Sequence, residues 1–579
     1  MRLNRSILCL PLSLLFLPTF IVPAYFDRNA PFNFITLSLI SLVATFFILK
    51  AKALTISKSV LLLLLGLVAG TFISFLINPS KINMLTGDTG RYTGLISLYA
   101  LLLVAISYTQ ITPKGFQSHL SWFLVAIVLV NIAGALQFLE ILKLPTGAGI
   151  GSTLGNSDFF SAWIGTSLAL IFLIEYKDLR LKYALQASLL FLSICLLWVI
   201  DVKQGFVDLI LLALLIVFWQ LVRKFDLLSL GSRFITTAVS VLTIIWFELI
   251  FLLPMLQVKL PYFLDDIQVT IRTHFWNAGL QMFFDYPAFG VGPDNYGNYY
   301  EQYRSLDSFK MTEYVLSNDA HSSVVQSFAT LGLVNMIIFT ALWVVLIRAW
   351  VINLFAYKSM QKFFLFIGAY LLIFATNSMI SPITLPNKFI FWAIAGFVIG
   401  SAANAKSDQI VGLRLKLVKL IAIAISALVA IVAINFSLAI ASFTKNLDLV
   451  KSNPAAIDYN YSPYLPCVIY FPAQLELAAA NKSISKLQLA NTQLQDNPRC
   501  IHTQILLAQT AINNEDYKEA KVLVENLLAM APARREVISL AATYSLKAKD
   551  EKMQQRLVAQ GEFLGIITTT KSEPQSPPK

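Results

Sequence analysis

One polar stretch, residues 272–335, combines histidine, arginine and a glycine-rich turn within an otherwise apolar sequence. It contains Arg272, His274, Arg304 and His321, and thus two of the four histidines of the chain. A neutral imidazole titrates near working pH and can accept a proton from a hydroxyl group. The guanidinium group of arginine can donate two parallel hydrogen bonds to the oxygens of a phosphate. These residue types are suited to activating a hydroxyl group next to a bound anion.

The most informative residue is His321, in the segment Asp319-Ala320-His321-Ser322, where a predicted long loop ends and an apolar helix begins. A histidine at this position can be structural, with Asn318 or Asp319 acting as the helix N-cap. However, nine residues separate Ser322 from Gly332, and arginines lie on neighbouring loops. On these grounds we predict that His321 is a catalytic base.

Three other polar segments are predicted at the same side of the membrane. Arg91 lies between Gly90 and Tyr92, where it is either an interfacial anchor or a phosphate-binding residue. Residues 151–156 precede an apolar helix, so that Asn156 either caps this helix or helps to bind an anion at its N-terminus. Lys203 lies in a tight turn, where it either balances nearby carboxylates or binds the same anion.

Aromatic residues surround Arg272 along the same stretch. Trp276 is typical of a membrane-interface belt. Tyr296, Tyr299, Tyr300 and Tyr303 follow at helical spacing, which indicates either an interfacial aromatic face or a platform on which sugars stack.

The composition of the chain identifies the elements that must position these residues. Only 13% of the 579 residues are charged and 57% are hydrophobic, whereas soluble globular domains carry roughly 25% charged residues. The sequence therefore predicts an all-α polytopic membrane protein of about 12–13 transmembrane helices. Crossing the membrane takes roughly 20 apolar residues, and the candidate spans are residues 6–24, 32–49, 59–77, 95–108, 120–139, 159–174, 183–200, 206–222, 234–253, 322–347, 363–380, 389–403 and 417–440.

The distribution of basic residues predicts the orientation of these spans. Lys and Arg concentrate in alternate short loops, such as the one that carries Lys50 and Lys52, and fewer lie in the loops that carry Lys81 and Lys388. The positive-inside rule then places the N-terminus in the cytoplasm and the large loop 254–321 outside. The net charge of +12 is accounted for in this way, without a nucleic-acid partner. The first span is expected to be retained rather than cleaved as a signal peptide.

The composition changes after the last span. We predict a membrane domain over residues 1–441, a linker over 442–473, helical repeats of the tetratricopeptide type over 474–565 and a disordered tail over 566–579. The repeat assignment depends on Pro498 and Pro532, which are 34 residues apart, the tetratricopeptide period. Cys467 and Cys500 flank the first predicted hairpin, so we predict a disulfide between them on the external side. No Cys-x-x-Cys pair or Cys/His cluster indicates a metal site.

The whole constellation resembles the O-antigen ligase and polymerase family of bacterial membrane glycosyltransferases. The resemblance covers roughly residues 60–400 and depends on His321, Ser322 and Gly332, on Arg272 with Trp276, and on Gly290-Val291-Gly292-Pro293. Asn335 departs from the family pattern, in which Gly, Thr or Tyr stands at this position. Lys203-Gln204-Gly205 stands where relatives often have Ser-Arg-Gly.

The resemblance implies transfer of a glycan from undecaprenyl diphosphate to an acceptor on the external face of the bacterial cytoplasmic membrane. The acceptor would be lipid A core, a growing polysaccharide or a protein hydroxyl group, and no metal or other cofactor would be needed. Arg272, Arg91 and Lys203 would bind the diphosphate, with Asn156, Arg304 and His274 as further candidates. The alternatives are a non-catalytic scaffold that recruits an envelope protein through its repeats, and a polysaccharide transporter.

Overall fold

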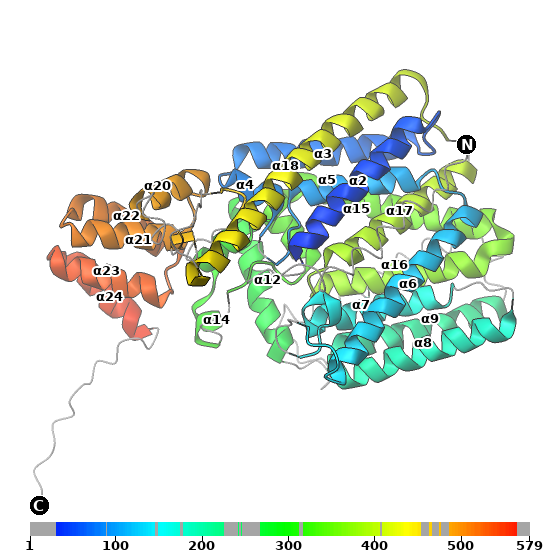
Figure 1. Cartoon of the computed structure of the whole chain (residues 1–579), viewed down its shortest axis with the longest axis horizontal. Helices are drawn as coiled ribbons and strands as arrows, with labels where there is room; N and C mark the ends of the chain where they lie inside the picture. Colours follow the sequence, from blue (N-terminus) through cyan, green and yellow to red (C-terminus); the bar gives the residue numbers. More distant parts are fainter. Residues whose placement is uncertain are drawn as a thin grey trace, which may run out of the picture.

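The computed structural model describes residues 30–88, 90–144, 149–173, 178–224, 267–311, 316–405, 408–452, 462–465 and 486–563, together with residues 241–242, 245, 474–475 and 477. Its ordered elements in these ranges are helices, and their only β-type contact is an isolated bridge between Leu54 and Ile410. The fold is therefore all-α, as the sequence predicts. Figure 1 shows a large helical bundle and, beside it, the smaller group of C-terminal helices.

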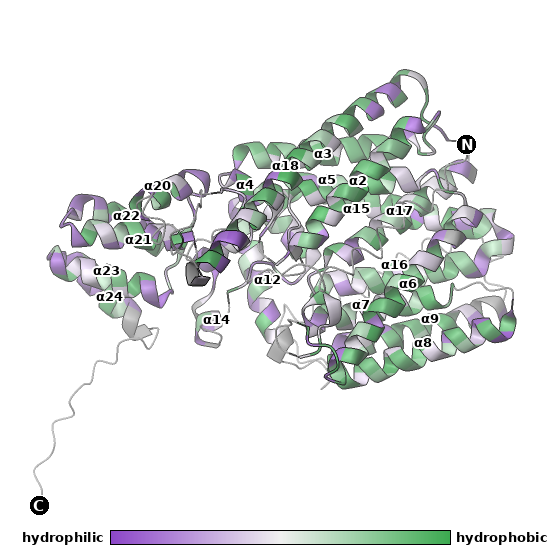
Figure 2. Ribbon diagram, in the orientation of Figure 1, coloured by the Kyte–Doolittle hydropathy of each residue, from purple (hydrophilic) through white to green (hydrophobic). Residues whose placement is uncertain are grey.

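Nine of the described helices are long and apolar enough to cross a membrane. They are α2 (Ala30–Lys50), α3 (Lys58–Ile77), α6 (Pro113–Phe138), α8 (Leu179–Ile200), α9 (Lys203–Lys224), α15 (Ser323–Ala356), α16 (Gln361–Ile380), α17 (Leu385–Ala405) and α18 (Gly412–Ser452). Two predicted spans fall on the shorter apolar helices α5 (Leu95–Tyr108) and α7 (Ser157–Ile171). The predicted spans 6–24 and 234–253 lie outside the described residues. Figure 2 shows that the residues of these bundle helices are predominantly hydrophobic.

The helix α5 lies at the centre of the bundle. It packs against α2 and α17, and most of its side chains are buried. A helix that is apolar on all sides is stable in such a position because it has no polar face to solvate. Its central place among protein neighbours accounts for a length below the roughly 20 residues of a typical span.

The loops gather at the two ends of the bundle. At one end, the backbones of Leu54 and Ile410 are hydrogen-bonded at 3.0 and 2.8 Å, which joins two loops predicted to lie inside. At the other end lie the short helices α4 (Lys81–Thr86), α13 (Gly297–Tyr303) and α14 (Leu306–Met311), together with the longer α12 (Ile267–Asp285).

A break in α15 explains the glycines of the His321 segment. Gly332 has φ +68° and ψ −176° inside the helix, and Gly290 has φ +66°. The two segments pair through backbone hydrogen bonds: Val291 N donates to Ala329 O at 2.9 Å, and Leu333 N donates to Pro287 O at 2.8 Å. A Cβ on either glycine would collide with the backbone of the other segment. Only glycine suits both the positive φ and this close approach.

Asn335, which departs from the family pattern, has a structural role at this break. Its Nδ2 donates to the carbonyl of Leu331 at 2.9 Å. This bond satisfies a backbone acceptor next to the interruption in the helix.

The C-terminal helices form antiparallel neighbours with their own core. They are α20 (Lys486–Asp496), α21 (Ile501–Asn513), α22 (Tyr517–Met530), α23 (Arg535–Lys547) and α24 (Glu551–Phe563). The turn between α21 and α22 falls at residues 514–516. Their assignment as tetratricopeptide repeats stays a prediction. Helix α18 continues to Ser452, into the range predicted as a linker, and the tail 566–579 lies outside the described residues.

Candidate active site

His321 lies on the turn before α15 and is held by Asp319. Its backbone N–H donates to Asp319 Oδ1 at 2.6 Å, and its Nδ1 lies 3.1 Å from the carbonyl oxygen of Asp319. A carbonyl oxygen can only accept, so this contact assigns the proton of the neutral ring to Nδ1 and leaves Nε2 as the basic nitrogen. The cap of α15 is Ser322, whose side chain accepts from Val325 N, rather than Asn318 or Asp319.

The backbone at His321 is unusual, with φ +53°. Non-glycine residues with positive φ are uncommon, and they cluster at functional sites. The imidazole ring packs against Phe275, with ring centroids 5.0 Å apart. The loop and the aromatic contact together fix the direction of the ring.

Aromatic side chains form a buried core beside His321. Trp276, Tyr296, Tyr299 and Tyr300 are all at most 3% exposed, and Tyr296 donates to the carbonyl of Phe275 at 2.7 Å. For these buried residues, the predictions of a membrane-interface belt for Trp276 and of an interfacial aromatic face or a sugar-stacking platform for the tyrosines are therefore wrong. Tyr303, the fourth predicted tyrosine, is partly exposed. Helical spacing gives an aromatic face, but it does not say whether another helix covers it.

The first turn of α7 contacts two of the predicted diphosphate-binding residues. Arg272 Nη2 lies 3.6 Å from Asp158 Oδ2, and the Arg91 guanidinium lies 5.1 Å from the centroid of the Phe159 ring. Asn156 caps this helix by accepting from Asp158 N at 2.7 Å. The side chain of Asn156 therefore orders the turn that holds the arginines.

Arg91 is further positioned by Asp294, which the sequence analysis did not single out. The Asp294 carboxylate accepts hydrogen bonds from Asp88 N at 3.0 Å, from Thr93 N at 3.2 Å and from Thr93 Oγ1 at 3.1 Å. It thus closes the turn that carries Arg91. The Nη1 atom of Arg91 is buried and has no hydrogen-bond partner among the described residues, which makes it available to an anion.

The charges of these residues act on His321. Burial, together with the positive charges of Arg91 and Arg272, lowers the pKa of His321 to about 4, and Asp319 opposes this shift. Lys388, at the start of α17, interacts electrostatically with Arg91, Asp294 and Asp319. Burial raises the pKa of Asp294 to about 6, against the effect of Lys388. Two cations and one carboxylate therefore act on the neutral imidazole of His321, and Lys388 and Asp294 both interact with Asp319.

Two predicted candidates have other contacts. His274 Nδ1 lies 3.3 Å from Ser305 Oγ, and Arg304 Nη2 donates to Ser308 O at 3.3 Å. Burial lowers the pKa of His274. The contacts of His274 with Ser305 and of Arg304 with Ser308 stabilise the turn between α13 and α14.

Lys203 is exposed at the start of α9. Two residues later, Gly205 N donates to Ser161 Oγ at 3.0 Å, which places this end of α9 beside the first turns of α7. Lys203 therefore lies at the same end of the bundle as the arginines.

Residues 188–340 match the family model described as O-antigen ligase. The chain carries an O-antigen ligase domain. The match includes Lys203, Arg272, His321 and Gly332, and with the apolar helices it identifies a multi-pass membrane protein. No curated protein matches the chain.

Two charged residues of the candidate site, Arg91 and Lys388, lie outside the range that matches the O-antigen ligase model. Arg91 was predicted from its flanking glycines, but Lys388 counted only as a topology marker because it stands alone after Pro386 in the sequence. Asp294 had a detectable signal, since it directly follows Gly290-Val291-Gly292-Pro293. Spacing along the chain does not indicate that Asp294 bonds to the turn of Arg91, or that Lys388 interacts with Asp294 and Asp319.

Proposed function

We propose that the protein is a glycosyltransferase that moves a glycan from undecaprenyl diphosphate to an acceptor hydroxyl group. The observation that carries this proposal is a neutral His321, with Nε2 as its basic nitrogen, within electrostatic range of Arg91 and Arg272. A base and a set of cations are what this reaction needs: one to accept the hydroxyl proton, the other to stabilise a diphosphate leaving group.

The proposed reaction has four bond changes. The acceptor oxygen forms a bond to the anomeric carbon of the glycan, while its proton moves to His321 Nε2. The bond between the anomeric carbon and the diphosphate oxygen breaks with its electron pair. The negative charge of the departing undecaprenyl diphosphate is held by Arg91 and Arg272, with Lys203 and Lys388 contributing further positive charge.

Binding of the donor should change the basicity of His321. In the free protein, burial and two arginines keep the pKa of His321 low, so that the ring is neutral but weakly basic. A bound diphosphate would cancel the positive field of Arg91 and Arg272 and raise this pKa toward working pH. A base is most effective when its pKa lies near the operating pH. His321 would therefore become a competent base only after the donor binds.

The location of the reaction follows from the predicted topology. We propose that the N-terminus is cytoplasmic and that the site and the repeats are external, in the periplasm. In support of this, Ser80, in a loop predicted to be external, contacts Asn497 of the repeat region at 2.7 Å.

The decisive experiment replaces His321 in a purified transfer assay with a lipid-linked glycan. His321→Ala should reduce turnover by about 100-fold or more. His321→Asn is the matched variant, because asparagine tolerates positive φ but has no basic nitrogen. Both proteins should be inserted at wild-type abundance. Near wild-type turnover in either variant would contradict the assignment. Transfer should also persist in EDTA, since we propose that no metal takes part.

A further inference from the structure

The repeat helices make extensive contacts with the external helices of the ligase domain. Phe309 of α14 is 4% exposed and belongs to the hydrophobic core formed by α21–α24. Helix α13 packs against α22. Figure 1 shows α12 and α14 between the membrane bundle and the C-terminal helices. The external loop is thus shared between two parts of the protein.

Two arginines of the repeat region, Arg499 and Arg534, contact α13. The guanidinium of Arg499 lies 3.7 Å from the centroid of the Tyr299 ring, and it donates to Asn298 O at 3.0 Å and to Gln302 Oε1 at 2.8 Å. Arg534 Nη1 lies 2.8 Å from Glu301 Oε1, and these two side chains are only 13% and 12% exposed. Arg534 Nε also lies 3.1 Å from Oε2 of the exposed Glu536. Removing Arg534 therefore leaves Glu301 as the buried charge that has lost its ion-pair partner.

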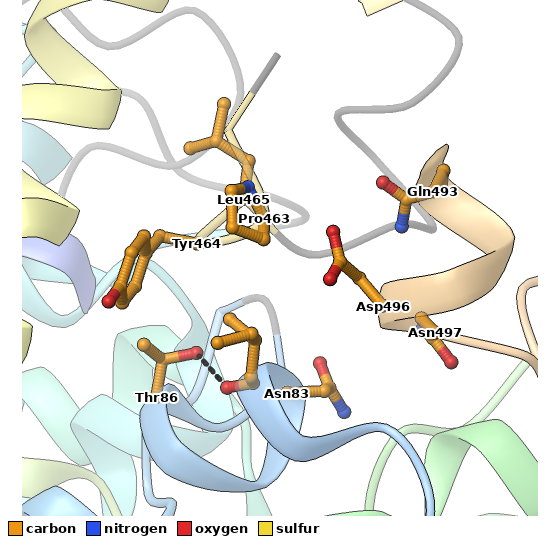
Figure 3. Close-up of a pocket in the computed structure, with 9 residues that line it drawn as sticks. Asn83, Thr86, Pro463, Tyr464, Leu465, Gln493, Asp496 and Asn497 are labelled. Atoms are coloured by element: carbon orange, nitrogen blue, oxygen red, sulfur yellow. Dashed lines mark hydrogen bonds between the residues drawn. The ribbon is translucent and has the colours of Figure 1, made fainter. Parts of the chain in front are cut away.

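A third contact joins the repeats to α4, on the loop that leads to Arg91. Ser80 Oγ and Asn497 Oδ1 are 2.7 Å apart. Figure 3 shows a narrow pocket at this junction, where Asn83 and Thr86 of α4 lie across from Asp496 and Asn497. The repeats therefore contact two segments that lead into the site.

The opposite side of α13 contacts the site itself. A Cβ on Gly297 would collide with the carboxylate of Asp88, in the turn of Arg91, and would press on Asn318, in the turn of His321. The ring of Tyr300 lies 5.5 Å from that of Phe275, and Phe275 lies 5.0 Å from the imidazole of His321. Helix α13 thus lies between the repeats and the two turns that carry Arg91 and His321.

A helix of this length is not stable by itself. Helix α13 has 7 residues, and isolated helices shorter than about 12 residues are marginal even with favourable sequences. Its position must come from what it packs against. The repeats supply the buried ion pair, the cation–π contact and the hydrogen bonds on the side away from His321.

We propose that the repeats act within the same chain as part of the transfer site, with Arg499 and Arg534 as positioning residues that hold α13 against the turns of Arg91 and His321. This inference rests on the proposed transfer function. It assigns the repeats a role in turnover in addition to any recruitment of a partner.

The test uses a charge exchange across the contact in the full-length protein. Glu301→Arg and Arg534→Glu should each lower kcat by about 10- to 100-fold, because α13 shifts relative to His321. KM for the lipid-linked donor should change much less. The double variant restores opposite charges at positions 301 and 534 and should recover part of the lost kcat, because Glu536 still lies beside position 534. Single variants with wild-type kcat would overturn the proposal, and so would a double variant no better than either single one.

The matched control is another ion pair of the repeats that lies away from α13. Lys521 Nζ and Asp550 Oδ2 are 3.2 Å apart, and reversing either charge should leave kcat unchanged. An equal loss of kcat in this control would mean that any disturbance of the repeats matters, and would overturn the specific role of Arg534.

A second readout is independent of catalysis. In membranes, cysteines at positions 301 and 534 should be joined by a short thiol-reactive crosslinker, as detected by mass spectrometry. Absence of this crosslink would overturn the contact. A crosslinked protein whose turnover is unaffected by His321→Ala would instead refute the proposed function while leaving the contact in place.

Discussion

Replacing Arg91 by methionine tests the electrostatic link between the cations and His321. The pKa of His321 is lowered from 6.5 to about 4, first by burial and next by the charge of Arg91. Since one pKa unit corresponds to about 1.4 kcal/mol, the environment favours the neutral imidazole by on the order of 3 kcal/mol. Methionine keeps the apolar volume beside Phe159 but removes the charge, so the pKa should rise by about 1 unit.

The assay measures kcat/KM between pH 4 and 8, because this quantity reports the pKa values of the free enzyme. A base must be deprotonated to act, so activity is lost as the pH falls through the pKa of His321. In Arg91→Met this loss should begin about 1 pH unit higher than in the wild type. The maximal rate should also fall, by roughly 100-fold, because the leaving group loses a cation.

Arg91→Lys is the matched control. It keeps the positive charge but cannot form a bidentate hydrogen bond with a phosphate. It should therefore lower the maximal rate without changing the pH at which activity is lost on the acidic side of the profile, the acidic limb. Asp294, with a pKa of about 6, contributes equally to all these profiles, so that only differences between variants are informative. An acidic limb at the same pH in Arg91→Met and the wild type would refute the electrostatic argument.

Four further predictions follow from the site and the fold. Arg272→Lys should lose at least tenfold in kcat/KM, because an ammonium cannot bind a phosphate bidentately; normal transfer would reduce Arg272 to an anchor. Gly332→Ala should lower stability by about 2 kcal/mol or more, measured as thermal unfolding in detergent, because its φ is positive and the backbone of Ala288 leaves no room. A reporter fused after residue 563 should be external, and a cytoplasmic signal there would invert the proposed topology. Cys500 is disulfide-bonded and Cys467 lies outside the described residues; mass spectrometry of non-reduced peptides should show the two joined.

The sequence predicts the membrane helices well because the signal is local. Eleven of the thirteen predicted spans coincide with described helices, including the short α5 and α7. An apolar run such as residues 59–77 has no soluble alternative, since its side chains need lipid or protein around them. The all-α fold follows directly, because a span must satisfy its backbone hydrogen bonds internally.

The site is only partly predictable, because its remaining members are brought together by tertiary contacts. His321 and Gly332 share one segment, so their spacing is readable. Asp294 and Lys388 act on Arg91 across three separate loops, and no local pattern marks this. Asn156 illustrates the other limit, because a cap and an anion ligand have the same sequence signature. The structure shows the capping contact with Asp158 N, and a role of Asn156 in anion binding stays a prediction.

Adjacent residues at the start of α7, Asp158 and Phe159, hold Arg272 and Arg91, whereas Asp319 holds His321 on a different element. In the proposed reaction, the residues that bind the leaving group are thus positioned by a different element from the residue that receives the acceptor. Mutations that reshape the approach of an acceptor to His321 can accumulate without altering the grip on the carrier lipid. If the proposed reaction holds, a fold arranged in this way can acquire new acceptors during evolution while it continues to use the same membrane-bound donor.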